Sequence, residues 1–151
     1  SGWVCSAPVP PGDVADPGFE AGTPNPSWDE YSKFYNTPIC DAATCGTGAG
    51  SGPLEGDYWV WFGGTTGYEE GYVAQDVVIP EDLTTLTFGL EASVCGQPED
   101  YTEVLVDGVR VGLVDGTNPI CGQLGYTTFS VDISPYADGG SHEIRFDSEV
   151  F

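Results

Sequence analysis

Few residues of this chain are suited to catalysis. The single histidine, His142, lies in a Gly-Gly-Ser-His turn, and no Ser or Cys stands in a recognisable nucleophile motif. Adjacent carboxylates such as Glu69-Glu70 and Glu99-Asp100 have the chemistry that glycoside hydrolysis requires. Among 24 acidic residues, however, adjacent pairs arise by chance, and neighbours on a strand point to opposite faces. We therefore predict that the protein is not an enzyme.

Disulfide bonds are the covalent chemistry that the sequence favours. Its five cysteines lack CxxC or Cys/His spacing, so disulfides fit them better than zinc. Cys40 and Cys45 can close a short loop, and Cys95 and Cys121 flank a predicted hairpin. This pairing is preferred but not fixed by the sequence, and it leaves Cys5 free or intermolecular. Disulfides form in oxidising compartments, which indicates a secreted, extracellular protein.

The charge of the chain is strongly negative. The chain has 24 acidic residues and only three basic ones, Lys33, Arg110 and Arg145, which gives a net charge of −21. This charge excludes nucleic acid and anionic membranes as partners. The carboxylates can bind Ca²⁺, keep the surface soluble in high salt, or prevent non-specific association. The chain has no run of 18 apolar residues, and it begins at Ser1 as a processed, secreted protein would.

The stretch Tyr101–Asp115 has the pattern of a β-hairpin. Asp107-Gly108 suits a type I′ turn because both residues tolerate a positive φ angle. Pairing Val106 with Val109 places alternate residues on one face of the hairpin. We expect that face to be buried and to consist of Val104, Val106, Val109, Val111 and Leu113.

The rest of the chain also favours strands. Twenty-two Gly and 12 Pro interrupt the sequence, and no long segment has a helical period. About eight antiparallel strands at regular spacing predict an all-β fold, a jelly-roll β-sandwich. Its main strands are expected at 58–62, 70–79, 83–95, 126–133 and 142–146. Residues 18–151 form the sandwich domain, and residues 1–17, which contain Pro8, Pro10 and Pro11, form an extended N-terminal arm.

Several segments together resemble a known type of module. They read DPGFEAG, PSWDEYS, ICDAATCGTG, YWVWFGG, VVIPEDLTTLTFGL, VLVDGVRV and VDISPYADGGSHEIRF in chain order. They are similar to a β-jelly-roll module of secreted bacterial proteins, which is related in layout to carbohydrate-binding modules and MAM-like domains. The resemblance runs from Pro17 to the end and implies fold and extracellular location. Modules of this type bind sugars or proteins.

The resemblance also implies a structural calcium ion at Glu20. Ca²⁺ takes six to eight oxygen ligands, which several loops can supply together. The other expected ligands are Asp16, Asp57 and Asp147, with Asp13 and Glu55 as further oxygen donors. The alternative is that these carboxylates are solvated at strand ends.

Modules of this type have one more strand after the point where this chain stops, at Phe151. Such a gap exposes unpaired backbone, which a neighbouring chain can fill. We therefore expect the N-terminal arm to complete a neighbour's sandwich, with Trp3, Cys5 and Val9 at the subunit interface. Head-to-tail donation of this kind builds a non-enzymatic extracellular filament. The simpler alternative is a truncated chain.

A second function, of a different class, is a Ca²⁺-stabilised carbohydrate-binding module from a larger secreted enzyme or adhesin. An aromatic platform for a sugar ring is available in Tyr58, Trp59, Trp61 and Tyr72. Such a strand is more often buried on both faces, as part of a core. Tyr101 and Tyr126 are then the better surface candidates.

Overall fold

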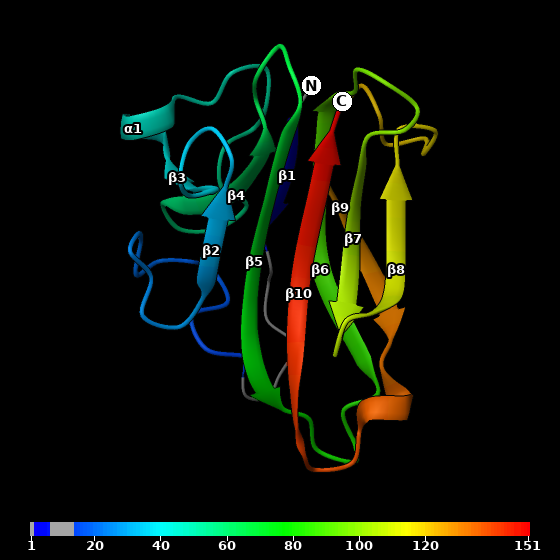
Figure 1. Cartoon of the computed structure of the whole chain (residues 1–151). Coiled ribbons are helices and arrows are strands. Elements are labelled where there is room, and N and C mark those ends of the chain that lie inside the picture. Colours follow the sequence, from blue (N-terminus) through cyan, green and yellow to red (C-terminus); the bar gives the residue numbers. More distant parts are fainter. Residues whose placement is uncertain (1, 7–13) are drawn as a thin grey trace.

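The computed structural model describes the backbone of residues 2–6 and the whole of residues 14–151 (Figure 1). The described part is built almost entirely from strands. In chain order its elements are β1 (Gly2–Ser6), β2 (Asp29–Ser32), β3 (Ile39–Asp41), α1 (Ala42–Cys45), β4 (Tyr58–Gly63), β5 (Glu69–Val78), β6 (Thr85–Val94), β7 (Tyr101–Val106), β8 (Val109–Asp115), β9 (Gln123–Asp132), a 3₁₀ turn (Ser134–Tyr136) and β10 (Ser141–Val150).

The strands form two five-stranded sheets. Sheet A has the order β3-β4-β1-β6-β9, and sheet B has the order β2-β5-β10-β7-β8. All of the described strand pairs are antiparallel. The predicted all-β sandwich is therefore confirmed, with ten strands where about eight were expected. Among the residues that the structure describes, no helix is long and apolar enough to cross a membrane.

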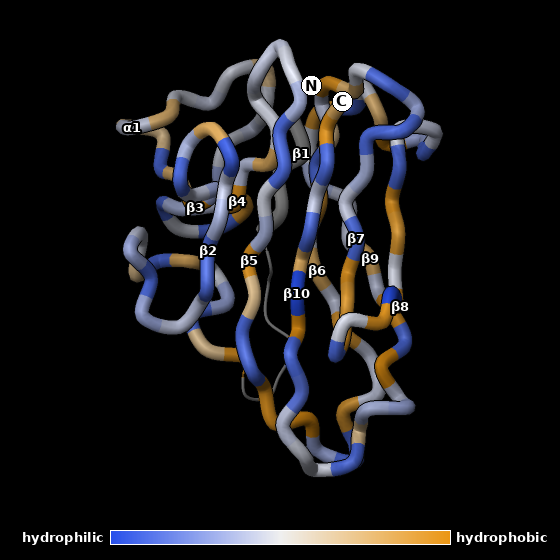
Figure 2. The backbone as a smooth tube through the Cα atoms, in the orientation of Figure 1, coloured by the Kyte–Doolittle hydropathy of each residue, from blue (hydrophilic) through white to orange (hydrophobic). Residues whose placement is uncertain are grey.

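The core lies between the two sheets. Phe88 of sheet A meets Phe146 of sheet B edge-on, with ring centroids 5.1 Å apart. Phe19 and Trp28, from the segment that precedes β2, pack at one side, with centroids 5.2 Å apart. Along β10, buried residues alternate with more exposed ones, and Figure 2 shows hydrophobic residues in short stretches along the strands. This two-residue period is what a strand with one buried face requires.

The β7–β8 hairpin has the predicted turn, but the register of its outer strand, β8, differs from the prediction. Asp107 and Gly108 have φ angles of 51° and 77°, and Val106 pairs with Val109, as expected. A register shift then follows, because Leu105 pairs with Arg110 but Val104 pairs with Gly112. This bulge reverses the alternation of β8. Val114 is consequently buried and Leu113 is 45% exposed, whereas Val109, which precedes the bulge, is 54% exposed. On β8 the predicted buried face was therefore correct for Val111, which packs against the core, and wrong for Val109 and Leu113.

The N-terminal strand lies in the chain's own sheet. β1 pairs with β4 on one side and with β6 on the other, from Gly2 to Ser6. In the single chain this segment completes the chain's own sandwich, and its donation to a neighbour, expected from the sequence, stays a prediction. The side chains of Trp3 and Cys5, and Val9 altogether, lie outside the described residues.

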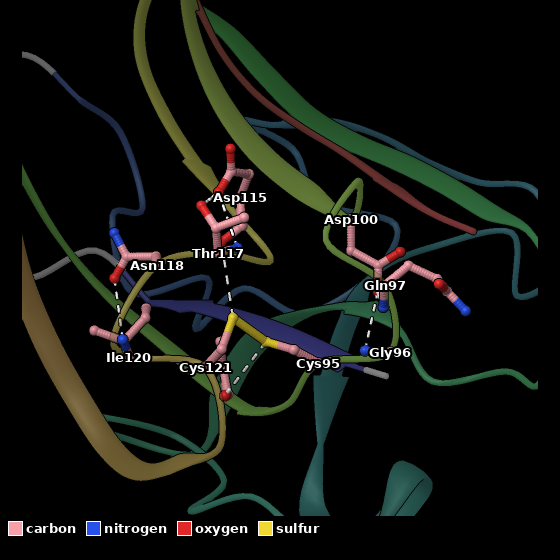
Figure 3. Close-up of a disulfide and its surroundings, with 10 residues drawn as sticks. Cys95, Gly96, Gln97, Asp100, Asp115, Thr117, Asn118, Ile120 and Cys121 are labelled. Atoms are coloured by element: carbon pink, nitrogen blue, oxygen red, sulfur yellow. Dashed lines mark hydrogen bonds between the residues drawn. A yellow bond between two sulfur atoms is a disulfide. The ribbon is translucent and has the colours of Figure 1, made fainter.

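The two predicted disulfides are present. Cys95–Cys121 joins the end of β6 to the loop between β8 and β9 (Figure 3). That loop is a series of tight turns, in which Asp115 accepts hydrogen bonds from Thr117, and Asn118 Oδ1 accepts one from the Ile120 amide. The bond therefore ties the outer edge of sheet B to the middle of sheet A. Cys40–Cys45 closes the short loop that contains α1.

Candidate functional site

A pocket of about 600 Å³ lies beside the short edge strand β3. Its size falls within the range of small-molecule binding sites. Three elements contribute to its lining, α1, β3 and β4, and Figure 1 shows them gathered on one side of the sandwich. Its lining combines aromatic rings with hydroxyls and one carboxylate: Thr23, Tyr35, Thr37, Ile39, Cys40, Asp41, Thr44, Cys45, Tyr58, Trp61, Gly63 and Gly64.

Trp61 of β4 forms one wall. Its ring stacks on Trp59, with centroids 6.2 Å apart, and Trp59 is buried beneath it. The loop at Gly48 approaches the ring closely, since a Cβ on Gly48 would lie 3.0 Å from Trp61 Cη2. Gly48 also has a φ of 54°, which disfavours other residues. The packing leaves Trp61 half-buried and fixed in position.

Tyr35 and Tyr58 supply two further aromatic rings. Tyr35 is 55% exposed, and its hydroxyl donates a 3.0 Å hydrogen bond to the carbonyl of Gly64. Tyr58 begins β4, and its ring packs beneath Gly22, where a Cβ would lie 3.2 Å from the hydroxyl oxygen. Both rings are therefore held from more than one side.

The polar side of the pocket is organised by the Cys40–Cys45 loop. Asp41 caps α1, since its Oδ1 accepts a 2.9 Å hydrogen bond from the Thr44 amide. The Thr44 side chain and amide lower the pKa of Asp41, so this carboxylate is ionised at neutral pH. The disulfide holds this loop closed and brings Thr44 and Asp41 to the same wall.

The residues predicted to bind calcium are divided between two places. Asp16 accepts hydrogen bonds from the amides of Glu20 and Ala21, and Glu20 in turn accepts them from the amides of Asp57 and Tyr58. These two carboxylates thus shape the loop that carries Thr23 and hold the start of β4.

Asp147 lies elsewhere, on β10, with Tyr72 and Glu103 as its cross-strand partners. Within the described ranges, no group of three or more His, Cys, Asp or Glu side chains is arranged to hold a metal. Calcium binding at Glu20, Asp16, Asp57 and Asp147 remains a prediction.

The other residues considered for chemistry have structural partners. His142 lies between Asp107 and Asp138, at 2.6 and 2.8 Å. The Tyr101 hydroxyl donates to Glu149, and that of Tyr126 donates to the Gly52 carbonyl. Tyr72 stacks on Tyr31 and lies beneath the guanidinium of Arg145, 4.0 Å from Cζ to the ring centroid.

Sequence reasoning found two of the three aromatic residues of the pocket. Tyr58 and Trp61 were candidates for a sugar platform, whereas Tyr35, Thr23 and Thr37 were missed. The available signal was the run Lys33-Phe34-Tyr35-Asn36, which places two aromatic residues in a turn with no strand alternation. Nothing in the sequence indicated that this turn, the Thr23 loop and β4 would meet.

Comparison with known proteins supports the fold. No family model and no curated protein matches the chain. A solved structure that is similar to it is described as TmCBM61, a carbohydrate-binding module, in complex with beta-1,4-galactotriose. The TM-score is 0.55 and the identity 16%, over 91% of this chain and 87% of that chain. At this identity the similarity establishes the shared β-sandwich fold.

Proposed function

We propose that the protein is a non-catalytic, extracellular carbohydrate-binding protein and that the pocket beside β3 holds the sugar. The observation that carries this proposal is the combination of Trp61, Tyr35 and Tyr58 with the hydroxyls of Thr23, Thr37 and Thr44. Aromatic rings pack against the C–H faces of sugars, and fixed polar groups orient their hydroxyls. The similarity to TmCBM61, which was solved with a galactotriose, supports this class of ligand. The two disulfides are compatible with an extracellular location.

The sugar should be neutral. Asp41 on the pocket wall is ionised, and the protein as a whole carries a charge of −21. A negatively charged sugar, such as a uronic acid or a sulfated sugar, would be repelled by the net charge of the protein as it approaches and by the Asp41 carboxylate inside the pocket. A neutral sugar can instead donate its hydroxyl hydrogens to the carboxylate of Asp41.

The same lining favours binding over hydrolysis. Cleavage of a glycosidic bond requires two carboxyl groups on opposite sides of that bond. The pocket is lined by one carboxylate, Asp41, and by no histidine.

A panel of neutral oligosaccharides that includes β-1,4-galactotriose, measured by calorimetry, tests this function. We expect Tyr35→Ala to lower the affinity of the best ligand about fivefold to tenfold, the equivalent of one lost aromatic contact. Tyr31→Ala is the matched control, because Tyr31 is an exposed tyrosine on the outer face of sheet B. Absence of binding across the panel, or an equal loss in both variants, would contradict the proposal.

Self-assembly by strand exchange is a second candidate function, favoured by the position of β1. This strand lies at the centre of sheet A, where it joins β4 to β6. A copy that gives its β1 to the next copy would form the same hydrogen bonds between chains. In this arrangement Trp3, Cys5 and Val9 become interface residues, as the sequence suggested.

Electron microscopy and size-exclusion chromatography, with and without reductant and EDTA, test this second candidate. We expect filaments that disappear when residues 1–11 are deleted. Monomers of about 15.9 kDa under all conditions would exclude strand exchange.

A further inference from the structure

The turn that follows β2 presents two aromatic side chains to solvent. Phe34 is 61% exposed and Tyr35 is 55% exposed. Tyr35 lines the pocket, whereas Phe34, the preceding residue, does not. An exposed aromatic residue is common on protein surfaces, and its exposure alone indicates no function.

A buried carboxylate fixes this turn from below. Glu69, at the start of β5, is 3% exposed. Its Oε2 accepts a 2.8 Å hydrogen bond from the Ser32 hydroxyl, and its Oε1 accepts hydrogen bonds from the amides of Lys33 and Phe34 at 2.9 and 3.3 Å. Within the described residues no Lys or Arg pairs with Glu69. Its charge is therefore stabilised by the turn itself.

Further hydrogen bonds close the turn on its other sides. The Ser32 hydroxyl accepts from the Tyr35 amide at 3.1 Å, and the Asn36 amide donates to the Ser32 carbonyl at 3.1 Å. The Tyr35 hydroxyl is bound to Gly64. Burying a carboxylate is costly unless it is hydrogen-bonded. The Glu69 carboxylate forms its hydrogen bonds with Ser32, Lys33 and Phe34, all at or next to this surface turn. The turn is thus pre-organised, which is the condition under which an exposed aromatic residue binds a ligand without a large entropic cost.

From this geometry we propose that Phe34 is a second sugar-contacting residue, which extends the site beyond the pocket and selects oligosaccharides over single sugars. The inference rests on the proposed carbohydrate-binding function. The pocket holds one end of a neutral oligosaccharide, and Phe34 contacts a sugar unit further along the same chain. Glu69 is a positioning residue that fixes the backbone of the turn at Lys33 and Phe34.

The test compares affinities for a neutral oligosaccharide series of increasing length, built from the sugar that the wild-type protein binds best. We expect Phe34→Ala to lower affinity for the longer members about fivefold to tenfold, the size of one aromatic contact, and to leave the shortest binder unchanged. Phe34→Tyr should restore the affinity for the longer members, because it keeps the ring. Leu124→Ala is the matched control, since Leu124 is 71% exposed on β9.

The outcomes distinguish a failure of the Phe34 inference from a failure of the proposed carbohydrate-binding function. A wild-type protein that binds no member of the series overturns the carbohydrate-binding function, and the inference with it. A wild-type protein that binds, together with a Phe34→Ala variant that has unchanged affinity at every length, overturns the inference alone. The inference alone is also overturned if Phe34→Ala lowers the affinity for the shortest oligosaccharide as much as the affinity for the longest.

Discussion

Glu91 is the residue whose replacement should affect both stability and the pocket. It lies on β6, between β1 and the edge strand β9 of sheet A, and is completely buried. Its carboxylate accepts hydrogen bonds from the Ser51 amide at 2.8 Å, from the Ser51 hydroxyl, and from the Gly125 amide. It therefore anchors the loop 46–52 on the outer face of sheet A, and Gly48 of this loop packs on Trp61.

The cost of Glu91→Ala can be worked from these three contacts. Hydrogen bonds to a charged group contribute roughly 1.5–3 kcal/mol each, but removing a buried carboxylate also removes its desolvation penalty. Disrupting a buried charged network typically costs roughly 3–5 kcal/mol. We expect a loss of about 3 kcal/mol. For a domain of this size, such a loss lowers the melting temperature by roughly 10 °C.

Urea unfolding and calorimetry of Glu91→Ala measure this loss, with Glu81→Ala as the control at an exposed position. The control should change the free energy of unfolding by less than about 0.5 kcal/mol. Because the loop also supports Trp61, the tryptophan fluorescence of the folded Glu91→Ala variant should differ from that of the wild type. Equal stability of the two variants would refute the anchoring role of Glu91.

Three further predictions concern a disulfide and two titrating groups. Replacing both Cys95 and Cys121 by Ser should lower the free energy of unfolding by about 2–4 kcal/mol in urea titrations, and an unchanged midpoint would contradict a stabilising bond. Burial, followed by the charge of Glu103, raises the pKa of Asp147 to about 6. The folded state then keeps a proton that the unfolded chain releases near its ordinary pKa of 3.8, so this contribution lowers stability as the pH rises from about 4 to 6. Asp147→Asn should remove that decline and stabilise the protein by about 1 kcal/mol near neutral pH, allowing for solvent screening; a steeper decline would contradict the assignment. Hydrogen bonds to Asp107 and Asp138 raise the pKa of His142 above its ordinary 6.5, so its contribution to stability is complete below that pH and is lost as the pH rises through the raised value. His142→Gln should abolish this slope in unfolding measurements, and a slope that persists would show that another group causes it.

Local patterns were sufficient to predict the strands and the turn of the central hairpin. In β6, strand alternation predicts that Leu86, Phe88, Leu90, Ala92 and Val94 are buried; the first four are buried, whereas Val94, at the end of the strand, is 42% exposed. Asp107-Gly108 forms the expected turn because its backbone preference depends on two residues only. The bulge in β8 was not predicted, although Gly112, an isolated glycine in a strand pattern at the register shift, is a local signal for one.

Features that depend on distant segments could not be predicted from the sequence. The same alternation places Glu91 and Gly89 on the solvent-facing side of β6, yet both are buried, and the loop 46–52 reaches Glu91 from far along the chain. The pocket similarly unites Thr23, Tyr35 and Trp61 from three separate segments. Strand alternation determines which face a residue occupies, but not what covers that face.

The central claim, that a neutral sugar binds against Trp61, is tested most directly by NMR. The chain has four tryptophans, and each gives its own indole N–H signal. Trp28 donates its indole hydrogen to the Asp16 carbonyl within the core, which makes it an internal reference. Titration with the tightest-binding oligosaccharide of the neutral panel should shift the Trp61 signal and leave the Trp28 signal in place. A titration that leaves Trp61 unmoved, or that moves only signals outside the pocket, would contradict the account.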